Sequence, residues 1–141
     1  MSAVLDTNAL IYDTFEDSAF HEEARSLLDE LERWVMPAIV VYEYVWALTE
    51  LGVAVDDVAY KVREYVCSPK AELVFGGAAG ILAALSMVER ERLSLARFND
   101  KVVLAVAKQR RCPLLTFDRR MRAQAARLGV DLLPKRYPAT R

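Results

Sequence analysis

The sequence predicts a single α/β domain in which helices cover both faces of a central parallel sheet. Two observations lead to this expectation. Short apolar runs fit buried strands, and the segments between them repeat apolar residues every three or four positions, as amphipathic helices do. A length of 141 residues suits one domain. We therefore expect residues 1–141 to form one unit, with 134–141 as a tail along the surface.

Composition and charge exclude several classes of protein. The chain is 54% hydrophobic with only five Gly and five Pro, which excludes a disordered or low-complexity chain. A net charge of −1 gives no general attraction to polyanions, so any nucleic-acid contact would use local patches. The apolar runs stop short of the roughly 20 residues that span a bilayer, and no signal-like segment opens the chain. We expect a cytoplasmic protein without membrane contact.

The N-terminal part begins with a predicted buried strand over residues 3–5 that ends at Asp6 and a Thr-Asn turn. A helical stripe follows over residues 24–34, with Ser18 as its candidate cap. Residues 35–41, which contain Pro37, fit a second strand. The next helix is predicted over 42–51, with Glu43 in its first turn.

The remaining chain continues this alternation. Helices are predicted over 55–66, 79–92 and 119–128 and from about Asn99-Asp100, and strands or extended links over 72–75, 113–117 and 130–133. Cys67 and Cys112 fit no metal or redox spacing, so free thiols are expected, although sequence leaves a disulfide open.

Four acidic residues stand in or directly after apolar runs, where a carboxylate has no evident structural role. They are Asp6, Glu43, Asp100 and Asp118. Burying one carboxylate costs several kcal/mol unless it is paired or binds a metal. Ligand sites in parallel sheets form at the carboxyl ends of the strands. Asp6 and Asp118 would therefore meet if their strands were adjacent, and a divalent cation would relieve the repulsion among the four.

Oxygen ligands suit one or two Mg²⁺ or Mn²⁺ ions. The chain has a single histidine, His21, so no catalytic histidine pair or Ser-His-Asp arrangement can be assembled. Water activated by a metal remains, and phosphodiester hydrolysis fits that chemistry. Asn8 and Thr116, each two residues from an acid, can hydrogen-bond a carboxylate or a bound water. Asn99 can do the same or cap its helix.

The ordered strings D-T-N at 6–8, V-x-E-x₄-L at 41–48, F-N-D-x₆-A at 98–107 and T-x-D at 116–118 resemble the PIN-domain family, especially the VapC-like ribonuclease toxins. The resemblance covers about residues 3–133. It implies a three-layer PIN-like fold and an Mg²⁺- or Mn²⁺-dependent endoribonuclease that hydrolyses RNA. It also implies a homodimer, an antitoxin protein partner, and Asp6, Glu43, Asp100 and Asp118 as the catalytic and metal-binding quartet.

Two features depart from the commoner family pattern. Tyr42 stands before the acid where a small residue is frequent, and Arg119-Arg120 follow Asp118 where another acid is common. These departures concern substrate placement, and both arginines are candidate contacts for RNA phosphates. Trp34, Trp46 and Phe98 are interpreted as core or dimer packing rather than base stacking.

Other interpretations of the acids stay open. Asp6 could only terminate a strand, Glu43 and Asp100 could complement helix dipoles, and Asp118 could form a surface ion pair. An alternative function is a phosphatase with Asp6 as the covalent nucleophile, although D-T-N lacks a second acid two residues on. A further alternative is a catalytically silent RNA-binding or scaffold domain.

Overall fold

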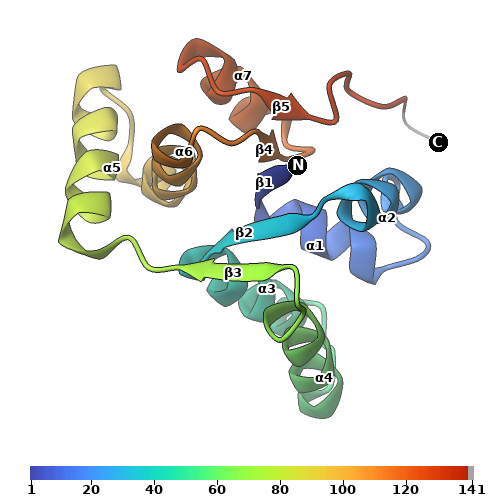
Figure 1. The fold of residues 1–141 in the computed structure, drawn as a ribbon. Coiled ribbons are helices and arrows are strands. Elements are labelled where there is room, and N and C mark those ends of the chain that lie inside the picture. Colours follow the sequence, from blue (N-terminus) through green and yellow to red (C-terminus); the bar gives the residue numbers. More distant parts are fainter. Residues whose placement is uncertain (140–141) are drawn as a thin grey trace.

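The computed structural model of the protein describes residues 1–139 and contains a five-stranded parallel sheet in the order β3-β2-β1-β4-β5 (Figure 1). The strands are β1 (Ser2–Leu5), β2 (Arg33–Pro37), β3 (Ala71–Val74), β4 (Leu114–Leu115) and β5 (Leu132–Leu133). The helices are α1 (Thr7–Thr14), α2 (His21–Glu30), α3 (Ala38–Glu50), α4 (Val55–Val66), α5 (Gly77–Glu91), the short 3₁₀ turn η1 (Leu95–Arg97), α6 (Phe98–Arg110) and α7 (Arg119–Arg127). The predicted α/β class is confirmed.

The helices form two layers around the sheet. The chain adds β2 and β3 on one side of β1, then returns to add β4 and β5 on the other side. Right-handed connections therefore place α1 to α4 on one face and α5 to α7 on the opposite face, an arrangement that Figure 1 shows. This confirms the three-layer architecture.

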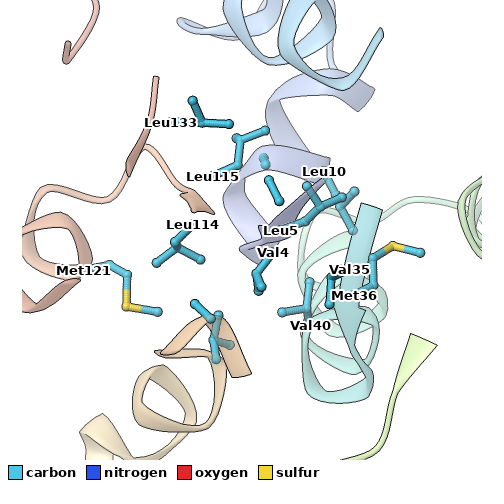
Figure 2. Close-up of a cluster of buried hydrophobic side chains, with 14 of the residues drawn as sticks. Val4, Leu5, Leu10, Val35, Met36, Val40, Leu114, Leu115, Met121 and Leu133 are labelled. Carbon is cyan, nitrogen blue, oxygen red and sulfur yellow. The ribbon is translucent and has the colours of Figure 1, made fainter. Parts of the chain in front are cut away.

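The core centres on β1 and β4. Val4 pairs with Leu114 and Leu5 with Leu115, and none of these side chains reaches solvent. Side chains from the flanking helices and from β2 complete the cluster around them (Figure 2). Because helices cover both faces, these strands are apolar throughout rather than alternating. Each such buried aliphatic side chain contributes about 1.5–3 kcal/mol.

The boundary between β2 and α3 differs from the prediction. The sequence suggested a strand through Val41, but β2 ends at Pro37 and α3 starts at Ala38. Pro37, with φ −59°, is the N-cap residue of α3 and cannot donate a hydrogen bond within a sheet. As a result, Glu43 is the sixth residue of α3 and lies in its second turn, not its first.

The segment after β1 also differs. A Thr-Asn turn was expected, but Thr7–Thr14 forms α1, which Asp6 caps by accepting a hydrogen bond from the backbone N–H of Thr7. Ser18 does not cap α2, which begins at His21, because its hydroxyl bonds the backbone carbonyls of Tyr12 and Phe15 at the C-terminal end of α1. His21 is buried, with Nδ1 2.9 Å from the carbonyl oxygen of Tyr12.

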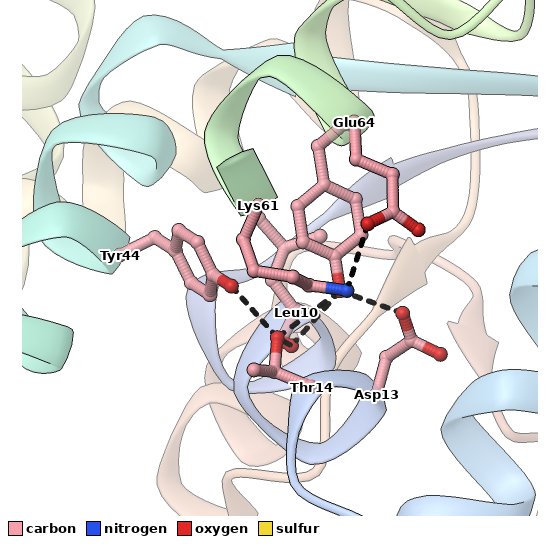
Figure 3. Close-up of polar contacts among 7 residues, drawn as sticks. Leu10, Asp13, Thr14, Tyr44, Lys61 and Glu64 are labelled. Carbon is pink, nitrogen blue, oxygen red and sulfur yellow. Dashed lines mark hydrogen bonds and ion pairs between the residues drawn. The ribbon is translucent and has the colours of Figure 1, made fainter. Parts of the chain in front are cut away.

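A polar network joins α1, α3 and α4 (Figure 3). Tyr65, the buried residue of α4, donates a 2.6 Å hydrogen bond to Oδ2 of Asp13, and its hydroxyl lies 3.2 Å from that of Thr14. The Thr14 hydroxyl is also 2.7 Å from Oη of Tyr44 on α3. Burial, followed by the charge of Asp13, raises the pKa of Tyr65, which therefore remains a protonated donor.

The segment after β5 is more than a surface tail. Tyr137 packs edge-on against Phe20 at a centroid distance of 5.5 Å and donates a 2.8 Å hydrogen bond to the carbonyl of Phe117.

Cys67 and Cys112 are both free. Within residues 1–139, no helix combines the length and apolar character needed to cross a membrane.

Candidate active site

The carboxyl ends of β1 and β4, together termed the crevice, lie where the order of strand addition reverses. Asp6 directly follows β1 and is the N-cap of α1, whereas Asp118 follows β4 and is the N-cap of α7. The two strands are neighbours, but α1 and α7 lead to opposite faces of the sheet. Open α/β sheets bind ligands at such switch points. The fold thus brings both acids to the edge that favours a site.

The Asp6 carboxylate is held by three hydrogen-bond donors. Its Oδ1 accepts from the backbone N–H of Thr7 at 2.9 Å, and its Oδ2 accepts from the amide of Asn8 at 3.0 Å and the hydroxyl of Thr116 at 2.7 Å. Only 7% of Asp6 is exposed. These contacts fix the direction in which a buried carboxylate faces the crevice.

Asn8 and Thr116 also connect the two strand ends. Oδ1 of Asn8 accepts a 2.8 Å hydrogen bond from the backbone N–H of Phe117, which leaves its amide NH₂ to face Asp6. The hydroxyl of Thr116 accepts from the backbone N–H of Asp118 at 3.2 Å while donating to Asp6. Asn8 and Thr116 therefore link the position of Asp6 to that of Asp118.

Asp118 is exposed and fixed through one oxygen. Its Oδ1 accepts hydrogen bonds from the backbone N–H groups of Arg120 and Met121 at 2.9 and 3.2 Å. The guanidinium of Arg119 lies over the ring of Tyr137, 4.0 Å from its centroid. Arg119 and Arg120 are both exposed, so they are accessible at the rim beside Asp118.

Glu43 reaches the crevice from α3. Its Oε1 accepts a 2.9 Å hydrogen bond from the hydroxyl of Thr7, in the first turn of α1. Thr7 was not among the residues that the sequence suggested. Its contact spans 36 positions, and only the packing of α1 against α3 brings the two residues together.

Asp100 lies in the first turn of α6, as expected. It accepts a hydrogen bond from the side chain of Gln124 on α7, and its Oδ2 is 4.0 Å from a guanidinium nitrogen of Arg97. Gln124, of which only 3% is exposed, was also absent from the residues that the sequence suggested. The sequence carried a signal for it, because Gln124 falls on the same helical stripe as buried Met121 and Ala125.

Neighbouring acids raise the pKa of two members of the quartet, Asp6 and Asp100. Burial raises the pKa of Asp6 to about 6, with hydrogen bonds from Thr116 and Thr7 opposing the shift and the charges of Asp100 and Glu43 adding to it. Burial also raises the pKa of Asp100, and the charge of Asp118 adds to that shift. Asp6 is thus close enough to Asp100 and Glu43, and Asp100 to Asp118, for their charges to interact. Over residues 1–139 the four carboxylates do not form a closed cluster of three ligands ready for a metal.

Asn99 lies next to this crevice rather than at a helix cap. The N-cap of α6 is Arg97. Asn99 is exposed and lines a hollow together with Thr7 and four residues of α3, one of which is Glu43.

Comparison with known proteins gives a family match. The family model described as PIN domain matches residues 3–127. No curated protein matches the chain significantly.

Several solved structures share the fold. VapC20 from Mycobacterium tuberculosis, described as a Sarcin-Ricin loop cleaving toxin, is 17% identical, with a TM-score of 0.75 over 86% of this chain and 94% of that one. FitAcB from Neisseria gonorrhoeae is 22% identical, with a TM-score of 0.65 over 94% and 96% of the two chains. VapBC2 from Rickettsia felis, bound to a DNA fragment from its promoter, is 15% identical, with a TM-score of 0.67 over 94% and 97%. At these identities the similarity concerns the fold.

Proposed function

The chain belongs to the PIN domain family, and we propose that it is a divalent-metal-dependent endoribonuclease that acts in the cytoplasm as the toxin of a toxin–antitoxin pair. The observation that carries this proposal is the coupling of Asp6, Glu43, Asp100 and Asp118 around the crevice between β1 and β4. The charges of Asp100 and Glu43 add to the raised pKa of Asp6, and the charge of Asp118 adds to that of Asp100. Carboxylates so placed are costly to keep ionised together, and a bound cation offsets that cost.

The residues present suit Mg²⁺ or Mn²⁺. The four candidate ligands offer carboxylate oxygens only, without histidine or cysteine. Mg²⁺ and Mn²⁺ are hard cations that prefer such oxygen ligands. Asp6, Glu43, Asp100 and Asp118 would hold one or two ions. A bound ion would lower the pKa of water and neutralise charge on a phosphodiester.

Neighbouring residues orient the acids in this proposal. Thr116 and Asn8 hold Oδ2 of Asp6, Thr7 holds Glu43, and Gln124 holds Asp100. Such partners of metal-binding groups affect metal affinity or activity about 10- to 100-fold when they are removed. Arg119 and Arg120 at the rim would contact phosphates of the RNA.

The phosphatase alternative has weaker support. An aspartate nucleophile of that class would need a second acid two residues on, where this chain has Asn8. Because the backbone N–H of Phe117 donates to Oδ1 of Asn8, its remaining NH₂ group faces Asp6 as a donor. An amide in this position cannot act as a general acid.

We also propose an antitoxin protein partner and a homodimer. The description of one further structural neighbour, from Klebsiella pneumoniae, is a toxin–antitoxin complex; it is 19% identical, with a TM-score of 0.61 over 82% of this chain and 86% of that one. Light scattering of the purified chain tests the dimer. Co-expression and co-purification with the protein encoded by the adjacent gene test the antitoxin partner.

The decisive experiment offers single-stranded and structured RNA to the protein with Mg²⁺, Mn²⁺ or EDTA. We expect cleavage with the ions, none with EDTA, and loss of cleavage in Asp6→Asn and Asp100→Asn. Asp131→Asn, at an exposed acid directly before β5, is the matched control and should cleave normally. Cleavage that survives EDTA or either site substitution would reject the mechanism, and beryllofluoride trapping on Asp6 would favour the phosphatase.

A further inference from the structure

The hollow beside the crevice has aromatic walls that the acidic quartet does not explain. It measures about 490 Å³ and is lined by Thr7, Tyr42, Glu43, Trp46, Ala47 and Asn99. Tyr42 is 62% exposed and Trp46 is 67% exposed. A tryptophan usually buries most of its large apolar surface. Two exposed aromatic side chains in one hollow therefore indicate a ligand with apolar faces.

The hollow is continuous with the candidate active site. Glu43 lines it, and Thr7, which lines it as well, donates a hydrogen bond to Glu43. Tyr42 precedes Glu43 by one residue and Trp46 follows it by three, so all three lie within about one helical turn of 5.4 Å. A polymer strand that presents a phosphodiester to Glu43 must place its neighbouring unit near these rings.

Electrostatics makes a second source of binding energy necessary. The net charge is −1, and Asp6 and Asp100 each lie near other acids, so the protein offers little general attraction to a polyanion. Stacking of a base on an aromatic ring does not depend on charge and tolerates every base. The exposed amide of Asn99, which lines the same hollow, can pair with a base edge.

We propose that Tyr42 and Trp46 form a nucleobase-stacking subsite for an unpaired nucleotide of single-stranded RNA beside the scissile phosphate. This inference rests on the proposed ribonuclease function and adds the element that holds the substrate. In this proposal, Tyr42 and Trp46 contact RNA rather than a protein partner.

The test measures RNA binding in EDTA, so that binding does not depend on cleavage. Labelled single-stranded RNA is titrated with the full chain and with Trp46→Ala, Tyr42→Ala and Tyr60→Ala. Tyr60 on α4 is 67% exposed, as Trp46 is, but does not line the hollow, which makes it the matched control. We expect the first two substitutions to weaken binding about tenfold each and the control to leave it unchanged.

Binding of RNAs that each lack one base distinguishes a stacking role of Trp46 from a purely structural role. Removing the base that occupies the subsite should weaken binding to the wild-type chain about tenfold and should not weaken binding to Trp46→Ala further. Unchanged affinity in Trp46→Ala, or equal abasic penalties in both proteins, would overturn the proposal. So would a change in oligomeric mass or antitoxin capture with RNA affinity intact, which would assign the rings to a protein interface.

The two proposals fail in different ways. If the wild-type chain binds RNA through the rings but cleaves nothing with Mn²⁺, the stacking subsite stands and the nuclease function falls. If Trp46→Ala and Tyr42→Ala bind and cleave RNA as the wild type does, the nuclease function stands and the subsite falls.

Discussion

Thr116 donates a 2.7 Å hydrogen bond to Oδ2 of Asp6, across 110 positions of the sequence. The parallel register explains the contact, since Leu5 pairs with Leu115 and the next residue of each strand follows in step. Thr116 is fully buried and is the donor that most lowers the pKa of Asp6 against the effect of burial. The pair joins the two central strands at the site.

Thr116→Val tests this relationship, because valine keeps the shape of threonine but lacks the hydroxyl. Near pH 7.5, where Asp6 is ionised, we expect unfolding to require about 1.5–3 kcal/mol less free energy, the range for hydrogen bonds to charged groups. Near pH 4.5, where Asp6 is largely protonated, the loss should be smaller. Urea denaturation at both pH values measures this. Thr116→Ser keeps the donor and should show no such pH dependence; an equal loss at both pH values in Thr116→Val would contradict the argument.

The raised pKa of Asp6 predicts a stability difference that depends on pH. The pKa is about 6 in the folded chain and about 3.8 ordinarily, so between these values the folded state binds more protons than the unfolded state. The free energy of unfolding of the metal-free protein should therefore fall as pH rises from 4 to 7, by about 3 kcal/mol from this group. Asp6→Asn should lack this component.

Thermal or urea unfolding of wild type and Asp6→Asn in EDTA checks the prediction, since other groups cancel in the difference. Asp131→Asn, at an exposed acid, serves as the control and should follow the wild type. Saturating Mn²⁺ should restore the stability of the wild type at pH 7, because an ion that binds only the folded state stabilises it. Parallel profiles for wild type and Asp6→Asn would disprove the assignment.

Thr7→Val should weaken divalent-ion binding. The Thr7 hydroxyl donates a 2.9 Å hydrogen bond to Oε1 of Glu43, and its loss would free that side chain to rotate. We expect Mn²⁺ affinity to fall about tenfold, as measured by calorimetry, with Thr7→Ser close to wild type. Thr49→Val, at an exposed threonine of α3 whose hydroxyl bonds its own helix, should have no effect. Full Mn²⁺ affinity in Thr7→Val would show that the contact does not position Glu43.

Tyr65→Phe should destabilise the packing of α4. The substitution removes the donor to Asp13 and the contact with Thr14, which lie in the network of Figure 3. Asp13 would lose this donor, whereas Thr14 keeps its contacts with Tyr44 and with the carbonyl of Leu10. The loss should cost about 1–3 kcal/mol in the free energy of unfolding. Tyr60→Phe, on the exposed side of the same helix, should change it by less than about 0.5 kcal/mol. Equal effects of the two substitutions would refute the role of the network.

The ion pair between Lys101 and Glu91 should respond unequally to loss of either partner. Nζ of Lys101 lies 2.8 Å from Oε2 of Glu91; the lysine side chain is fully buried, whereas 27% of the glutamate side chain is exposed. Glu91→Gln leaves a buried ammonium without its counter-charge, which should destabilise by about 3 kcal/mol. Lys101→Met replaces the buried charge with an apolar chain of similar length and should cost less. Urea denaturation of both variants decides; a larger loss in Lys101→Met would contradict this account.

Most of the architecture was predictable from sequence, because strand and helix patterns depend on residues that are close together in the chain. Apolar runs ended by Asp6 and Asp118 marked the two strands of the crevice, and the helical stripe predicted α4 with its observed bounds, Val55–Val66. The second strand was predicted to run on to Val41 instead of ending at Pro37, because the fixed φ of proline suits a strand end and a helix start equally. The Thr7–Glu43 and Gln124–Asp100 contacts join separate helices, so no local pattern specifies them.

Trp34 and Trp46 show the same limit of prediction from local sequence. Both were interpreted as core or dimer packing. Trp34 packs against the core and donates a 3.0 Å hydrogen bond to the carbonyl of Leu28. Trp46 is 67% exposed, so the core interpretation is wrong for it. Helical periodicity shows which residues share a face, but only the arrangement of neighbouring elements decides whether that face is covered.

The strand order also has a consequence during synthesis on the ribosome. β1 emerges early, but β4, its neighbour at the crevice, follows more than a hundred residues later. Asp6 therefore has neither Thr116 nor Asp118 beside it until β4 and the residues after it have been made. Fragments released by premature termination before that point should lack the proposed nuclease activity, because Asp118 of the acidic quartet would be missing.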